Sequence, residues 1–397
     1  MPRRLTLRLL VLVTAVATVL PALSGPALAD QEPITLPPLP VRLGEGQPCT
    51  EASAKTATAA SWSGQALSLT RAHELSRGEG VTVAVVDTGV GSAIPALSGR
   101  VPVLGSAGTD CPGHGSFVAG LIAAAPEMGN GVVGLAPQAR ILAVSGTDDR
   151  GAPSVGRVAQ GIRDAAERGA EVIYVGATLR LGRAELASAV TYATGKDALV
   201  VAPAAPDAVP SEELGPNGEA PRGPYWPAAL PGVLSVVDYG SNGERQQKAP
   251  PAYRPDVEAP GDGMVSVGPH GSGHYIGSGA SLAAACAAGA AALVRAHHPE
   301  MTAEQTSRQL LETSYPSDIP RLDPYAAVST VLPPARSHSA LDAAKPPAAR
   351  MSAPADTGPR TWGLGVAGVF LAVVLLVGAC GLVIPRGRSR GWLPPGP

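Results

Sequence analysis

The chain has 397 residues, which is enough for one large catalytic domain with shorter appended segments. Its net charge of −2 argues against a nucleic-acid partner, because it provides no broad basic surface. Aromatic residues make up only 4% of the chain, and the 48 glycines and 41 prolines predict a loop-rich body with a core of small aliphatic side chains.

The first 29 residues have the pattern of an export signal. Three arginines within the first eight residues precede an apolar run from Leu9 to Leu20, and Ala27-Leu28-Ala29 supplies small residues typical of a cleavage site. A retained membrane anchor is the alternative, and it is disfavoured because the apolar run is short and ends at Pro21. The pattern therefore predicts a signal peptide over residues 1–29.

Residues 30–61 are rich in proline and show no sustained periodicity, which predicts an extended arm lying on the domain. From Trp62 to Arg77 the apolar residues recur at helical spacing, and Gly78 and Gly80 follow. This pattern predicts one amphipathic helix that opens a catalytic domain over residues 62–331.

Apolar, β-branched runs then alternate with helical patterns. The predicted strands are Val81–Val86, Ile141–Val144, Val172–Val175, Leu199–Ala202 and Val233–Val237, and the predicted helices are Phe117–Ala125, Val155–Arg168, Ala184–Ala193, the Ala-rich run that begins at Ser281, and Ala303–Glu312. This alternation predicts an α/β fold with a doubly wound parallel sheet. Catalytic groups in such folds gather at the carboxyl ends of the strands.

The C-terminal part predicts a spacer and a membrane span. Residues 332–361 form a Pro/Ala-rich linker, and the 23 residues from Trp362 to Ile384 contain no charge. As a helix this run would be about 34 Å long, which is enough to cross a bilayer. Arginines at 386, 388 and 390 place the tail, residues 385–397, in the cytoplasm and the body outside the cell.

The four cysteines fall into two groups. Cys380 lies in the predicted span and Cys286 in the apolar helix, so both are expected to stay free. Cys49 and Cys111 remain, in an exported and oxidising setting, and we predict that they form a disulfide.

Three residues in separate small-residue contexts carry the chemistry: Asp87 in VAVVDTGV, His114 in CPGHGSFVAG and Ser281 in GSGASLAAACAAG. A serine nucleophile needs a base to take its proton and an acid to orient that base. The order Asp, His, Ser is the one found in subtilisin. The DTG at Asp87 also occurs in aspartic proteases, but the second DTG, at Asp356, lies in the spacer without a preceding strand, which disfavours a two-aspartate site.

With these motifs, the chain resembles the subtilisin (S8) family of serine peptidases and, within it, the mycosins, the membrane-anchored proteases of type VII secretion systems. The segments YWPAALPGVLSVV and DVEAPGDGMVSV also match the family. The resemblance implies that Asp87 orients the imidazole, His114 is the general base and Ser281 is the nucleophile. It also implies a protein or peptide substrate, type VII secretion components as partners, and a disulfide between the arm and the segment before the catalytic histidine. No cofactor is expected, nor a metal, because no acidic cluster has calcium-loop spacing.

The chain departs from the family pattern at the oxyanion hole. The family asparagine that donates there falls on Pro206 or Asp207, and neither is an asparagine. Proline cannot donate and a carboxylate would repel an oxyanion, whereas a protonated Asp207 could donate. Loss of this donor costs about 10²–10³ in kcat, a magnitude that comes from subtilisin itself. Tyr174 and Gly176 replace a family asparagine and serine beside the cleft.

Ala280 and Ala285 replace the usual threonine and proline around the nucleophile. Two functions follow from these departures. The first is a slow or narrow endopeptidase whose substrate completes the oxyanion hole. The second is a catalytically impaired scaffold that stabilises a secretion complex. We favour the peptidase, because loss of activity would be expected to change Ser281 or His114 as well. The arm could be a removable propeptide or a permanent brace, and its short length favours the brace.

Overall fold

The computed structural model describes residues 35–333 and 358–391. The predicted signal peptide, most of the linker and the last six residues of the tail lie outside the described residues. The chain divides into two compact units at about residue 332.

The first unit is built on a six-stranded parallel sheet. Its strands are β1 (Thr82–Asp87), β2 (Arg140–Ser145), β3 (Val172–Val175), β4 (Leu199–Pro203), β5 (Val233–Tyr239) and β6 (Val257–Pro260), in the order β2-β1-β3-β4-β5-β6. The strand order reverses at β1, which pairs with β2 on one side and β3 on the other. Ligand sites of open α/β sheets form at such a reversal, outside the carboxyl ends of the strands.

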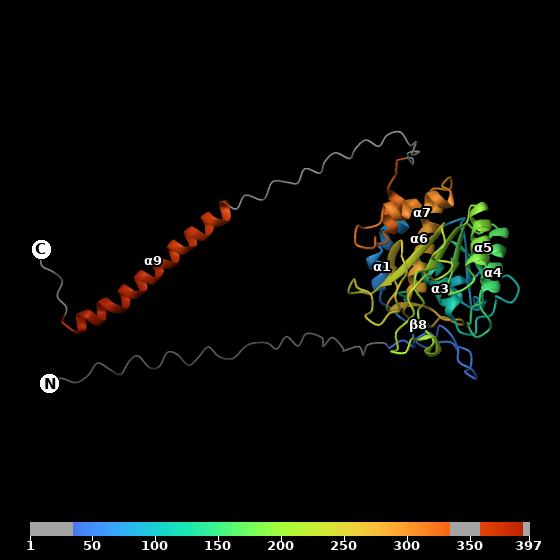
Figure 1. Cartoon of the computed structure of the whole chain (residues 1–397), viewed down its shortest axis with the longest axis horizontal. Helices are drawn as coiled ribbons and strands as arrows, with labels where there is room; N and C mark the ends of the chain where they lie inside the picture. Colours follow the sequence, from blue (N-terminus) through green and yellow to red (C-terminus); the bar gives the residue numbers. More distant parts are fainter. Residues whose placement is uncertain (1–34, 334–357, 392–397) are drawn as a thin grey trace, which may run out of the picture. The chain divides into compact units, whose positions relative to one another are not determined.

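Helices cover both faces of the sheet, which confirms the predicted doubly wound α/β class. Figure 1 shows α4 (Val155–Glu167) and α5 (Arg183–Gly195) on one face and α6 (Ala280–His297) on the other. Helix α3 (His114–Ala123) packs with α6, and α7 (Ala303–Glu312) and α8 (Pro324–Ser329) close the unit. Each face has its own cluster of buried aliphatic side chains.

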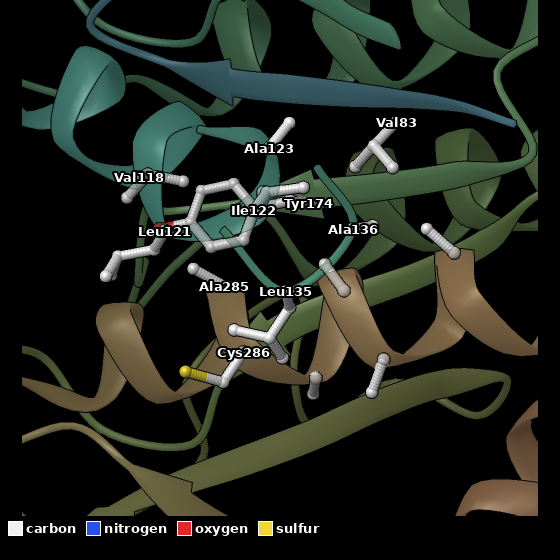
Figure 2. Close-up of a cluster of buried hydrophobic side chains, with 14 of the residues drawn as sticks. Val83, Val118, Leu121, Ile122, Ala123, Leu135, Ala136, Tyr174, Ala285 and Cys286 are labelled. Carbon is white, nitrogen blue, oxygen red and sulfur yellow. The ribbon is translucent and has the colours of Figure 1, made fainter. Parts of the chain in front are cut away.

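Helix α6 is the buried centre of one of these clusters. Its residues from Ala280 to Arg295 are all buried, and most of them are alanines, which let the helix lie close to the sheet. Figure 2 shows Ala285 and Cys286 of this helix near Leu135, with Ile122 and the ring of Tyr174 in the same cluster. Burial raises the pKa of the Cys286 thiol to about 12, which makes it unreactive.

Two predicted boundaries were wrong for local reasons. The single helix from Trp62 to Arg77 is two short helices, α1 (Trp62–Ala66) and α2 (Leu69–Leu75), because Ser68 between them has a left-handed backbone with φ of 51°. The helix predicted from Phe117 begins three residues earlier, at His114, since Gly113 with φ of 95° turns the chain directly into it.

Three strands carried no clear sequence signal. Strand β6 is short and reads VEAP, and the antiparallel pair β7 (Met264–Val267) and β8 (His274–Gly277) lacks a continuous apolar run. The pairing of these segments is set by tertiary contacts, which the local pattern does not encode.

The arm is extended and hydrogen-bonded to this unit. The Leu39 N–H donates to the Ile276 carbonyl at 2.9 Å, and the Ile276 N–H donates to the Pro37 carbonyl at 3.0 Å. Cys49 and Cys111 are joined in the predicted disulfide, which ties the arm to the loop before α3.

The second unit contains one long helix, α9 (Gly358–Ser389). Its stretch from Trp362 to Ser389 contains an 18-residue segment with a mean hydropathy of 2.8, is unburied over that segment and is long enough to cross a membrane. Helix α6, with 18 residues and a mean hydropathy of 1.3, is also long and apolar enough to cross a membrane, but 89% of it is buried in the first unit. Helix α9 is therefore a candidate transmembrane span, and it contains the predicted run of 362–384.

Candidate active site

The structure brings Asp87, His114 and Ser281 together from three separate elements. Asp87 is the last residue of β1, His114 is the first residue of α3, and Ser281 is the second residue of α6. All three lie at the carboxyl edge of the sheet, where β1 and β3 are neighbours. They are far apart in sequence, and the parallel sheet with its two covering helices is what joins them.

The three side chains form a hydrogen-bonded line. Nδ1 of His114 lies 2.9 and 3.0 Å from the two carboxylate oxygens of Asp87, and its Nε2 lies 3.0 Å from the Ser281 hydroxyl oxygen. The exposed fractions are 4% for Asp87, 5% for His114 and 1% for Ser281. Such a line can orient an imidazole through one nitrogen and pass a serine proton to the other.

A fourth buried residue, Asp110, holds the turn that carries the histidine, and the sequence analysis missed it. One of its carboxylate oxygens accepts from the Thr88 hydroxyl at 2.7 Å and the Gly113 N–H at 2.8 Å. The other oxygen accepts from both the N–H and the hydroxyl of Ser116, at 2.7 and 2.6 Å. Burial raises the pKa of Asp110, against the effect of these hydrogen bonds. The available signal was an acidic residue shortly before a helix whose N-cap is a glycine. Gly113 has no side chain to accept from the first-turn N–H groups, so a nearby carboxylate is expected to do so.

Gly176 and Tyr174 are coupled departures from the family pattern. A Cβ at Gly176 would lie 1.9 Å from a carboxylate oxygen of Asp87 and 2.9 Å from the Tyr174 hydroxyl oxygen. Because Gly176 has no Cβ, the Asp87 carboxylate can occupy this position without a steric clash. The buried Tyr174 hydroxyl lies beside Asp87 and Ser281, and it makes no well-aligned hydrogen bond among the described residues.

Asp207 occupies the position beside the Ser281 amide. The sequence left this position to Pro206 or Asp207, and Asp207 is the residue found there. One carboxylate oxygen accepts from the Ser281 N–H at 2.9 Å, and the other accepts from the Ser281 hydroxyl at 2.5 Å and lies 3.6 Å from Nε2 of His114. Asp207 therefore accepts hydrogen bonds where the family asparagine donates one.

His114 thus lies between two carboxylates. Burial alone would lower the pKa of His114, but the charge of Asp87, the hydrogen bonds with both carboxylates and the charge of Asp207 together raise that pKa well above 6.5. The imidazole is consequently stabilised in its protonated, positively charged form.

A cleft of about 500 Å³ opens beside the line of side chains. It is lined by residues of the arm (Val41, Arg42), of the strand edge (Asp87, Gly176) and of the loops that follow β3 and β4 (Thr178 to Leu181, Pro206 to Pro210). An extended peptide can lie in such a groove. The lining reaches His114 and Asp207, which are the hydrogen-bond partners of Ser281.

The comparisons with known proteins agree with this geometry. Residues 78–342 match the model of the subtilase family, peptidase S8. The chain is 31% identical to mycosin-3 of Mycobacterium tuberculosis over 82% of this chain and 83% of the relative, and 32% identical to subtilisin E of Bacillus subtilis over 60% and 61%.

Solved structures give the same result. The structure of the MycP3 protease from the type VII (ESX-3) secretion system is 30% identical, with a TM-score of 0.59 over 75% of this chain and 98% of that one. A chain in the periplasmic assembly from the ESX-5 inner membrane complex is 26% identical, with a TM-score of 0.64 over 81% and 95%. The chain therefore belongs to the subtilase family of serine peptidases and, within it, to the mycosins.

Proposed function

We propose that the chain is a membrane-anchored serine endopeptidase that cleaves peptide bonds with Asp87, His114 and Ser281. The observation that carries this proposal is the hydrogen-bonded line of these residues beside the cleft. Asp87 orients the imidazole, His114 takes the proton of Ser281, and the Ser281 oxygen attacks the substrate carbonyl. The alternative of an inactive scaffold is not favoured, because the distances along this line suit proton transfer.

A fluorophosphonate probe tests this function, since it reacts with an activated serine. We expect the full-length protein in detergent to be labelled at Ser281 on prolonged incubation. Ser281→Ala should abolish labelling and lower kcat by about 10⁶, the magnitude known for the same loss in subtilisin, a relative of this chain. A folded wild-type protein, judged by circular dichroism, that stays unlabelled at every pH would contradict the peptidase function.

The proposed setting is the membrane complex of a type VII secretion system, with the catalytic unit outside the cell and the tail in the cytoplasm. Its support is the kinship with mycosins, the likeness to a chain of the ESX-5 inner membrane complex, and the exposed apolar face of α9. Truncation after residue 357 should move the protein from the membrane to the soluble fraction. Retention of the truncated chain in the membrane would contradict anchoring by α9.

A further inference from the structure

The pocket beside the Ser281 amide is filled by a side chain of the chain itself. A serine peptidase uses this amide N–H to stabilise the oxyanion that forms on the substrate. Here the N–H donates to Asp207, whose side chain is 5% exposed. The carboxyl group is packed onto Gly279, where a Cβ would lie only 2.2 Å from it. A substrate carbonyl cannot reach the amide while Asp207 is in place.

Asp207, Ser281 and His114 also form one line of hydrogen-bonded groups. The Ser281 oxygen lies 2.5 Å from the Asp207 carboxylate and 3.0 Å from Nε2 of His114. In one arrangement the hydroxyl donates to a charged Asp207 and accepts from a protonated His114. In the other a neutral Asp207 donates to the serine oxygen, and the hydroxyl donates to a neutral His114. The two arrangements hold the same number of protons and differ by a shift of two protons along the line.

We propose that Asp207 holds the resting enzyme in a self-inhibited form, with its carboxylate on the Ser281 amide and hydroxyl, and that cleavage begins when the substrate carbonyl displaces this carboxylate. The inference rests on the proposed peptidase function. In the resting form the oxyanion pocket is occupied, and the raised pKa of His114 favours the imidazolium, which cannot accept a proton. When Asp207 is displaced, it leaves as the neutral acid with the proton of the Ser281 hydroxyl, and the Nε2 proton of His114 passes to the serine oxygen. The amide is then free and His114 is the neutral base.

The loop that carries Asp207 can move without disturbing the sheet. Between residues 207 and 222, the backbone N–H hydrogen bonds that the structure gives all end within the loop itself, as from Glu213 to Pro210 and from Gly215 to Glu219. Most of these residues are exposed. Such segments open at low free-energy cost. At its far end the loop also accepts hydrogen bonds from the side chains of Tyr225 and Arg180, on the Pro221 and Arg222 carbonyls. Withdrawal of Asp207 itself has to break its two hydrogen bonds with Ser281 and its contact with Nε2 of His114.

The charges around Asp207 determine the sign of the pH dependence. The titratable and polar groups that face Asp207 come from four elements: His114 on α3, Asp87 on β1, Tyr174 on β3 and Ser281 on α6. The charged side chains that line the same cleft are Arg42, Arg180 and Glu213. Asp207 contributes to the raised pKa of His114. The neutral, competent imidazole therefore appears only as the pH rises through that raised pKa. Removing the charge of Asp207 should lower the pKa and move the rising limb of activity to lower pH.

The test measures the rate of fluorophosphonate labelling against pH for the full-length protein in detergent. Asp207→Asn replaces the acceptor with a donor, and we expect it to speed labelling by about 10²-fold. It should also move the rising limb down by roughly 1–2 pH units. Asp207→Ala frees the pocket without a donor and should give a smaller gain. Glu212→Gln is the matched control, because it removes a nearby exposed charge outside the cleft lining, and its rate should stay within about twofold.

Labelling of Asp207→Asn at the wild-type rate with an unchanged pH profile would overturn the self-inhibition and leave the triad intact. The imidazole N–H signal of His114 in NMR gives a second measurement that does not depend on turnover. A His114 pKa that is the same in the wild type and Asp207→Asn would also overturn the inference. A lowered pKa without labelling of Ser281 in either protein would support the contact with Asp207 and contradict the peptidase function instead.

Discussion

The two halves of the active site are built differently, although each contributes one carboxylate to His114. The half formed by β1 and α3 carries Asp87, and Asp110 holds its turns through four hydrogen bonds. The half formed by β4 and α6 carries Asp207, on a loop whose backbone N–H groups donate only within the loop. Asp87 lies at Nδ1 of His114, whereas Asp207 lies on the Nε2 side and accepts from the Ser281 hydroxyl. In the proposed mechanism, the first carboxylate supports catalysis and the second keeps the resting site closed.

The largest effect that should distinguish the two halves comes from an aspartate-to-asparagine substitution at Asp87, the counterpart of Asp207→Asn. Asp87→Asn should lower kcat by about 10⁴, because the amide favours the wrong tautomer of His114. The effect is opposite in sign to that of Asp207→Asn. Steady-state cleavage of a peptide by both variants, with circular dichroism as the control for folding, measures the contrast. If both substitutions lowered activity equally, the two carboxylates would have the same role and the comparison would fail.

Loss of the disulfide should destabilise the half that contains α3 more than the half that contains α6. Cys49 and Cys111 are 62 residues apart, and Cys111 lies three residues before His114. Replacing both with serine should lower the free energy of unfolding by up to about 4 kcal/mol, because the unfolded chain regains its loop freedom. Urea denaturation measures this change, and hydrogen exchange should show larger opening at α3 than at the start of α6.

Cys286→Ala is the control, because it replaces a buried, free cysteine in α6 and breaks no disulfide. It should cost less stability than loss of the disulfide, since no covalent closure is lost. Equal exchange protection at α3 with and without the disulfide would show that the arm does not brace the histidine half.

The smallest expected effect is at Tyr174, on the strand between the two halves. Its hydroxyl is buried beside Asp87 and Ser281 and makes no well-aligned hydrogen bond among the residues described. Tyr174→Phe should therefore raise the free energy of unfolding by about 1 kcal/mol, because an unpaired polar group leaves the interior. Thermal and urea unfolding measure the change. A loss of stability, or a fall in kcat beyond tenfold, would instead assign the hydroxyl a hydrogen bond in the working site.

The sequence predicted most of the fold because its periodic segments are long and buried. The strands from β1 to β5, the helices α4 to α7 and the parallel sheet follow from apolar runs alternating with helical spacing. The break at Ser68 was not predictable in this way, since a left-handed serine has no local signature. Strand β6 and the β7–β8 pair were missed for a related reason, because their pairing partners are distant in the chain.

The candidate site likewise has features that the sequence predicted and features that depend on the tertiary structure. The residue types and order of Asp87, His114 and Ser281, and the absence of the family asparagine, are properties of the sequence alone. The sequence also predicted the disulfide, because Cys286 and Cys380 lie in apolar helical segments and only Cys49 and Cys111 remain. Only the tertiary structure decided that Asp207 rather than Pro206 meets Ser281, that it accepts rather than donates there, and that Asp110 holds the histidine turn. The physical reason is that hydrogen bonding depends on distances of about 3 Å between groups from different elements, and these distances exist only after the sheet and its helices have packed.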